Sequence, residues 1–134
     1  MTIHTADRLN QITGTILSAA IDVHRALGPG LFEKAYLTCL TRDLSDAHLR
    51  IDLQKAIPLV YRGVSIDCAY RADLVVEESV LVELKAIEVF APIHEQQVRT
   101  YLRLGHYPVG LLLNFSAPTM KAGIKRIVND FPDP

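Results

Sequence analysis

The chain has 134 residues, which predicts a single compact domain over residues 1–134. Hydrophobic residues make up 49% and charged residues 22%, which excludes intrinsic disorder, and no apolar run approaches the roughly 18 residues of a membrane span. The formal net charge of −1 excludes a strongly basic surface, so any contact with nucleic acid must come from a local patch. The first 11 residues lack the apolar core of a secretory signal, and two cysteines are too few for a disulfide scaffold, so we expect a cytoplasmic protein.

Two helices are predicted at the start of the chain. Residues 7–27 carry one apolar stripe at helical spacing, and Gly28-Pro29-Gly30 ends it, because Gly suits a helix C-cap and Pro cannot continue the turn. A second helix is expected over residues 31–47, with its leucines pointing inward: Leu37, Leu40 and Leu44.

Strands are predicted next. Residues 50–61 are extended in character, and Pro58 within them favours an edge position. Arg62-Gly63 predicts a turn. Residues 68–76 and 80–87 then indicate a hairpin around residues 77–79.

The last third of the chain is predicted as helix, strand and helix. Pro92 suits the first turn of a helix to about Leu104, and residues 109–115 form an apolar run typical of a strand covered on both faces. Residues 120–128 are expected to form a short helix with Ile124 and Ile127 inward. The order α-α-β-β-β-α-β-α predicts an α/β fold with one mixed central sheet flanked by helices.

The hairpin carries two carboxylates that we expect to face each other. If the turn takes three residues, Val76 pairs with Val80, and Asp73 lies opposite Glu83. Alternation then puts Asp73, Glu83 and Lys85 on one face with Val75 and Leu81, and the opposite face carries Leu74, Val80, Val82 and Leu84. Opposed carboxylates are destabilising, and a Mg²⁺ or Mn²⁺ ion between them would remove that penalty. A solvated charged face is the simpler alternative.

Glu33 and Gln97 are polar residues expected on inward helix faces. Glu33 precedes the three leucines of the second helix by four, seven and eleven residues, and an unpaired buried carboxylate would cost several kcal/mol. A metal, a lysine or Tyr36 could partner it. In the third helix, Glu95, Arg99 and Arg103 predict a solvated face, which leaves inward Ile93, Gln97, Tyr101 and Leu104. A buried Gln needs hydrogen-bond partners, which a functional site or a structural bond could equally supply.

These residues match a known set of motifs. Residues 30–36 read G-x-x-E-x-x-Y, and the chain resembles the GxxExxY protein family along nearly its whole length. That family is similar to the PD-(D/E)xK nuclease superfamily, with its restriction-endonuclease-like fold, and within it to the RecB-like exonuclease branch. The motifs appear in order as Gly30 to Glu33, Asp73, Glu83-Leu84-Lys85, and Gln97 to Tyr101. One departure is Ala72, which stands where the superfamily name has proline.

The resemblance implies a metal-dependent nuclease that hydrolyses phosphodiester bonds in DNA. Asp73, Glu83 and the backbone carbonyl of Leu84 would ligate Mg²⁺ or Mn²⁺, and Glu33 would hold a water on the metal or a second metal. Lys85 would orient the attacking water, act as a base or stabilise charge in the transition state. Gln97 would bond the water or Lys85, and Tyr101 would support that helix.

Other residues have weaker claims to function. His24, in the V-H-x-x-L-G-P-G segment of the family, could border the active site or be structural, and Cys39 and Cys68 are expected to be small buried residues. The cations available for substrate contact are Arg71, Arg99, Arg103, Lys121, Lys125 and Arg126. Lys121 and Lys125 would share one face of the last helix.

Three functions therefore stay open. The first is a nuclease acting on DNA, and the second is a catalytically inactive module with the nuclease fold that binds nucleic acid or a protein partner. Hydrolysis of another phosphoester, such as a nucleotide, is the third. Because the net charge is so small, we expect weak, salt-sensitive binding of nucleic acid, with a protein partner or a homo-oligomer completing the footprint.

Overall fold

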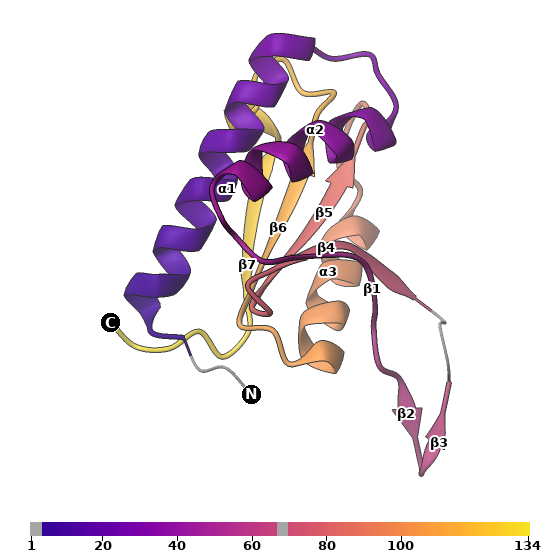
Figure 1. Ribbon diagram of the computed structural model, residues 1–134. Coiled ribbons are helices and arrows are strands. Elements are labelled where there is room, and N and C mark those ends of the chain that lie inside the picture. Colours follow the sequence, from indigo (N-terminus) through magenta and orange to yellow (C-terminus); the bar gives the residue numbers. More distant parts are fainter. Residues whose placement is uncertain (1–3, 67–69) are drawn as a thin grey trace.

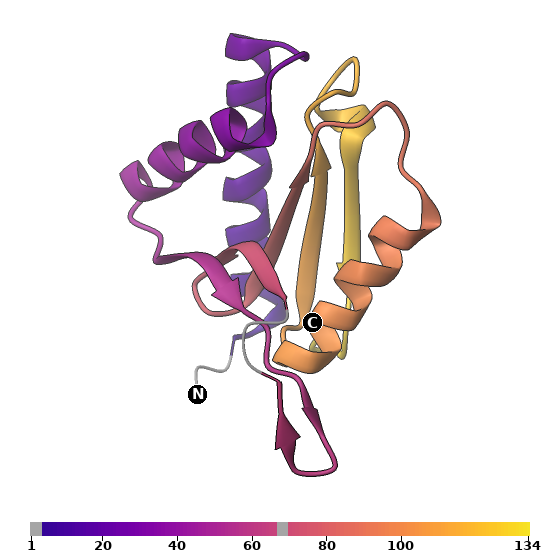
Figure 2. The same cartoon turned by 90° about the vertical axis from the view of Figure 1, so that its right-hand side faces the viewer.

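The computed structural model describes residues 4–66 and 70–134 and contains one central sheet covered by helices on both faces (Figure 1). The sheet has five strands in the order β1-β4-β5-β6-β7. Helices α1 and α2 pack on one face and α3 on the other, as Figure 2 shows from the side. This is the mixed α/β architecture predicted from the sequence. Among the described residues, no helix is long and apolar enough to cross a membrane.

The two N-terminal helices are α1 (Ala6–Leu27) and α2 (Glu33–Asp46). The Thr5 side chain caps α1 by accepting a hydrogen bond from the Arg8 N–H, and Gly28 ends it with φ +69°, a conformation that favours glycine. The connecting loop is held by Tyr36, whose hydroxyl donates to the Gly28 carbonyl at 2.6 Å and accepts from the Leu31 N–H at 3.1 Å. Tyr36 therefore stabilises the loop and is not the predicted partner of Glu33.

The hairpin of β4 (Arg71–Val76) and β5 (Val80–Lys85) has the predicted register, with Val76 opposite Val80. Helix α3 (Pro92–Gly105) then carries the chain to β6 (Val109–Asn114), which pairs parallel to β5. All six residues of β6 are buried, which confirms a strand covered on both faces.

The predicted last helix is wrong. Residues 121–123 form a short 3₁₀ turn, η1 (Lys121–Gly123), and Ile124–Val128 forms β7, which pairs antiparallel to β6. The three-residue spacing of Ile124 and Ile127 imitates a helix. The exposed backbone edge of β6 needs a hydrogen-bonding partner, however, and tertiary pairing overrides that local pattern.

The expected strand over residues 50–61 is divided in two. β1 (Ile51–Ala56) pairs with β4 in the sheet, whereas β2 (Val60–Tyr61) turns at Arg62-Gly63 and pairs with β3 (Val64–Ser65). The β2–β3 hairpin projects away from the sheet (Figure 2). Pro58 lies between β1 and β2, and β1 is the edge strand, as predicted. Cys68, which was expected to begin the next strand, lies outside the described residues.

Each face of the sheet has its own apolar core. Leu74, Val80, Val82 and Leu84 face α1 and α2, as predicted, while Val75 and Leu81 pack under α3. The inward residues of α3 are Val98, Tyr101 and Leu102. Ile93, expected to face inward, is instead 62% exposed, because it lies in the first turn of α3, beyond the edge of the packed interface.

Candidate active site

The regular pairing of β4 and β5 ends at Leu74–Val82, and at the next position side chains accept the backbone N–H groups. Glu83 Oε1 accepts the Asp73 N–H at 2.8 Å, and Asp73 Oδ2 accepts the Leu84 N–H at 2.9 Å. Each carboxylate thus occupies the place of a backbone carbonyl from the opposite strand. The regular register ends at Leu74–Val82, so Asp73 and Glu83 are not a backbone pair as predicted; each instead bonds through its side chain to the other's strand.

Both carboxyl groups hold their protons more tightly than usual. Burial, and then the nearby charge of Asp73, raise the pKa of Glu83 from 4.5 to about 8, and the side chain is only 5% exposed. Burial also raises the pKa of Asp73, against the lowering effects of the Leu84 hydrogen bond, Lys85 and Gln54. Because the charge of Asp73 acts on buried Glu83, the two carboxyl groups favour a proton or a cation beside them.

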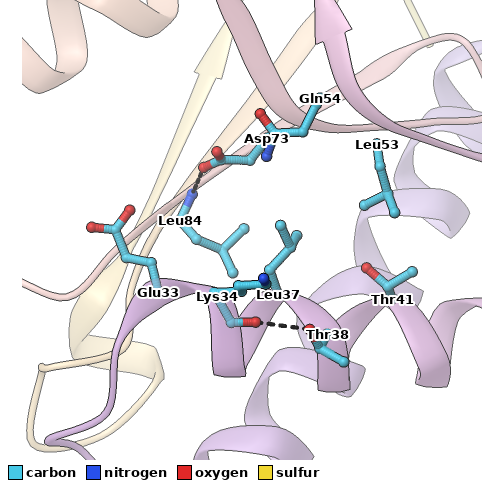
Figure 3. Close-up of a pocket in the computed structure, with 9 residues that line it drawn as sticks. All are labelled: Glu33, Lys34, Leu37, Thr38, Thr41, Leu53, Gln54, Asp73 and Leu84. Carbon is cyan, nitrogen blue, oxygen red and sulfur yellow. Dashed lines mark hydrogen bonds between the residues drawn. The ribbon is translucent and has the colours of Figure 1, made fainter.

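Glu33 is exposed rather than buried, which corrects the expectation of a costly inward carboxylate. It is the first residue of α2, where the helix has little cover and a negative charge is favourable. Its side chain nevertheless lines the same cavity as Asp73 (Figure 3), and its charge contributes to the raised pKa of Glu83. Glu33 therefore belongs to the rim of the carboxylate pair.

Lys85 and Tyr101 also lie within electrostatic reach of the pair. The charge of half-buried Lys85 lowers the pKa of both Asp73 and Glu83. Burial raises the pKa of Tyr101, and the charges of Glu83, Tyr70 and Asp73 raise it further. Gln97 lies one helical turn before Tyr101 on α3 and is half-buried; its bond to a water or to Lys85 stays a prediction.

Asp73 does not share a face with Val75 as strand alternation predicted. Val75 packs under α3, whereas Asp73 lines the cavity beside α2 together with Leu84. The cause lies in the neighbouring strand, because Gln54 has φ +51° and the regular β1–β4 register skips the Gln54–Asp73 position. This local departure turns Asp73 toward α2.

Two supporting residues were missed by the sequence analysis. The Gln54 side chain acts to lower the pKa of Asp73, and the left-handed backbone of Gln54 leaves no mark in the sequence. Asn114 ends β6 and is buried; its side-chain amide donates to the Ile87 carbonyl at 2.8 Å and accepts the Ile87 N–H at 3.1 Å. A polar residue inside the apolar run 109–115 was the available clue. Asn114 fixes the chain just after Lys85.

His24 and Cys39 have structural surroundings. His24 is buried, its Nε2 lies 2.9 Å from the Ala117 carbonyl, and it borders a cavity that none of the predicted catalytic residues lines. Cys39 is half-buried and packs against the core of α1 and α2.

The six cations proposed for substrate contact have different surroundings. Because β7 replaces the last helix, Lys121 and Lys125 do not share a helix face, and Lys125 lies over the Phe90 ring at 5.6 Å. Arg126 stacks on Phe131 and donates to Asn10, and Arg99 pairs with Glu95. Arg71 donates to the Gln54 carbonyl, beside the carboxylate pair.

The carboxylate pair fits a divalent cation that keeps part of its water shell. Within residues 4–66 and 70–134, no group of three His, Cys, Asp or Glu side chains could by itself hold a metal ion. Asp73 and Glu83 could supply two oxygen ligands, however, and the Leu84 carbonyl points to the same side of β5 as its N–H, toward the gap. Mg²⁺ is commonly held by one or two carboxylates together with waters and substrate phosphates.

The mixed sheet, the flanking helices and the acidic gap between β4 and β5 define a restriction-endonuclease-like α/β protein. A family model described as the PD-(D/E)XK nuclease superfamily matches residues 10–127, which is most of the chain. The chain therefore belongs to the PD-(D/E)XK nuclease superfamily. Comparisons with curated proteins and with solved structures return no significant match.

Proposed function

We propose that the protein is a metal-dependent nuclease that hydrolyses phosphodiester bonds in DNA. The observation that carries this proposal is the pair of half-buried Asp73 and buried Glu83, whose carboxyl groups bond to each other's strand without an ion pair within the described residues. A fold gains nothing from such a pair, because two buried like charges destabilise it. A site that binds a cation for chemistry does gain from it.

Asp73, Glu83 and the Leu84 carbonyl would hold Mg²⁺ or Mn²⁺. When bound, the cation supplies Lewis acidity toward a phosphate oxygen and promotes deprotonation of water. Glu33, at the exposed rim, would position water at the mouth of the site. Lys85, whose charge already acts on both carboxyls, would stabilise the negative charge that develops on the phosphate or orient the attacking water. Gln97 and Tyr101 would support that water and helix α3.

We also propose the narrower assignment to the GxxExxY family and the RecB-like branch. Its support is local: Gly30 has φ +106°, Glu33 begins α2 beside the carboxylate pair, and Tyr36 bonds to the loop that presents Glu33. In this motif Gly30 thus allows the turn, Glu33 lies at the acidic rim of the site, and the Tyr36 hydroxyl stabilises the loop. A cytoplasmic location and a single domain stay predictions.

The alternative is an inactive module that keeps the nuclease fold and binds nucleic acid or a protein partner. The small net charge of −1 favours this alternative, since a nuclease must approach a polyanion. The presence of both gap carboxylates and Lys85 favours the enzyme, because a module without chemistry has no use for a destabilising acidic pair.

Cleavage assays separate the two. Single- and double-stranded DNA and RNA are incubated with Mg²⁺, Mn²⁺ or a chelator, using the wild-type protein and the Asp73→Ala and Lys85→Ala variants. We expect cleavage of DNA by the wild type with metal only, and none by the variants. Cleavage that persists in both variants would indicate a contaminant. No cleavage, together with calorimetry that detects no divalent-ion binding, would favour the inactive module.

A further inference from the structure

Asp73 lines a cavity of about 510 Å³ between α2 and the strands β1, β4 and β5 (Figure 3). This volume lies within the range of about 300–1,000 Å³ typical of small-molecule sites. A divalent cation and a phosphate would occupy only the end of it near Asp73. The rest of the cavity takes no part in the proposed hydrolysis.

The cavity has two chemically different ends. Glu33 and Asp73 bring carboxyl groups to one end, Leu53 and Thr41 line the other, and Leu37 lies between them (Figure 3). Lys34, which follows Glu33 on α2, also lines the cavity. Glu33, Leu37 and Thr41 follow one another at intervals of four residues and therefore lie on one face of α2. Eight residues of helix span about 12 Å. That length suits one nucleotide, with its phosphate at the acidic end and its base at the apolar end.

The apolar walls suit a flat heteroaromatic ring. Leu37 and Leu84 pack against the core of α1 and α2, which holds their side chains in place at the base of the cavity. Leu53 on edge strand β1 is 52% exposed at the rim. An exposed leucine beside a cavity loses contact with water when a base covers it, which favours binding. Unpaired bases are commonly held between apolar side chains in this way.

One polar group at this end lacks a partner. Among the described residues, none bonds to the buried Thr41 Oγ1, whereas the Thr38 hydroxyl, one turn earlier, donates to the Lys34 carbonyl at 2.9 Å. Threonine in helices adopts two rotamers, and rotation between them would turn the Thr41 hydroxyl toward the cavity. It could then bond to an edge of the ring.

We propose that this cavity is a nucleobase subsite that receives the base of the nucleotide next to the scissile phosphate. The inference rests on the proposed nuclease function for the phosphate end, and it names the substrate class: a strand whose base at the cleavage position is unpaired. A base within a duplex is stacked and paired and cannot enter the cavity without being extruded.

The first test measures binding without phosphate or metal, so it does not depend on catalysis. Deoxyadenosine and thymidine are titrated into the full chain with ¹³C-labelled leucine and threonine methyl groups, and deoxyribose is the control. We expect the methyl signals of Leu37, Leu53 and Thr41 to shift with the nucleosides and not with deoxyribose. Equal shifts with deoxyribose, or no shifts at these methyl groups, would overturn the subsite.

A pair of matched variants locates the binding. Thr38 is exposed at the cavity wall, so Thr38→Trp fills the cavity without disturbing the core, while Ser45→Trp places the same ring on an exposed position of α2 that does not line the cavity. We expect Thr38→Trp to weaken nucleoside binding by about tenfold or more and Ser45→Trp to leave it unchanged. Equal affinities in the two variants would place binding elsewhere.

Cleavage provides the second readout. Single-stranded oligonucleotides with one abasic residue are compared with the intact strand and with a duplex. We expect cleavage next to the abasic position to fall by about tenfold or more, and the duplex to be the poorer substrate. Nucleoside-specific methyl shifts without any cleavage would support the base subsite and refute the nuclease. Cleavage at the same rate next to abasic positions would support the nuclease and refute the base subsite.

Discussion

The carboxylates at the two ends of the β4–β5 hairpin have different partners. At the turn, Glu77 pairs with Arg8 at 3.2 Å and accepts the Arg50 N–H at 2.6 Å, and Glu78 pairs with Arg50 at 2.7 Å. At the open end, Asp73 and Glu83 each accept a backbone N–H group, and among the described residues neither forms an ion pair with a Lys or Arg.

This difference separates structural charge from functional charge. The chain neutralises the carboxylates at the turn with arginine, although these groups are partly exposed and tolerate solvation. At the open end, buried Glu83 and half-buried Asp73 are left to be neutralised by a proton or a cation. Sites that store instability in this way commonly trade folding free energy for function. Four experiments can break or sharpen the contrast.

The largest effect is expected when a cationic side chain is removed at one end of the hairpin and the loss of cleavage is compared with removal at the other end. Lys85→Ala should reduce cleavage by about 100- to 10,000-fold, because the group that stabilises charge or moves a proton is lost. Arg50→Ala should leave the cleavage rate within about twofold, since it affects only the turn. Initial rates on labelled single-stranded DNA provide the measurement. Similar losses in the two variants would remove the distinction between the ends.

The next effect concerns stability against pH in the presence of a chelator. The folded protein keeps the proton of Glu83 up to a pKa of about 8, whereas the unfolded chain releases it near 4.5. Unfolding therefore releases a proton between these values, and the free energy of unfolding should fall as pH rises from about 4.5 to about 8. Asp73, whose pKa is also raised, acts in the same direction.

Glu83→Gln removes the titrating proton and keeps the acceptor for the Asp73 N–H. We expect this variant to be more stable than the wild type at pH 9 by about 2–4 kcal/mol, with a flatter pH profile, in urea titrations. Glu77→Gln is the matched control at the turn, and it should keep the wild-type slope. A wild-type profile that is flat from pH 5 to 8 would contradict the raised pKa of Glu83.

A smaller effect should follow from adding a divalent cation. At a Mn²⁺ concentration about 100 times its Kd, the wild type should gain about 2.7 kcal/mol, or on the order of 10 °C in Tm. Glu77→Gln should gain as much, while Asp73→Asn and Glu83→Gln should gain almost nothing. Thermal denaturation at pH 8 measures this, and equal stabilisation of all four proteins would indicate a cation site elsewhere.

The smallest effect is expected at the turn itself. Arg8→Ala breaks an ion pair whose side chains are 43% and 22% exposed. Such partly exposed pairs contribute about 0.2–1 kcal/mol, so the variant should unfold at only slightly lower urea and cleave DNA normally. A loss well above 1 kcal/mol would mean that the turn carries more of the stability than its exposure implies.

The hairpin illustrates how far sequence reasoning reaches. Its register followed from a three-residue turn and from alternation, and the structure confirms the Val76–Val80 pair. The same alternation failed at Asp73, because Gln54 on the neighbouring strand adopts a positive φ that no pattern of residue types displays. Periodicity also failed for residues 124–128, where β-branched residues at helical spacing form a strand on the edge of β6.

By itself, the sequence determined the local elements with strong periodicity, the two helices before residue 47 and the hairpin, because burial of an apolar face repeats at 3.6 or 2 residues. It also determined which acidic and basic groups are available. Only the tertiary structure decided that Glu33 stays exposed at the start of α2, that Asp73 turns toward α2, and that a largely apolar cavity extends from Asp73. Exposure, strand opening and cavities arise between segments far apart in the chain, and no local spacing records them.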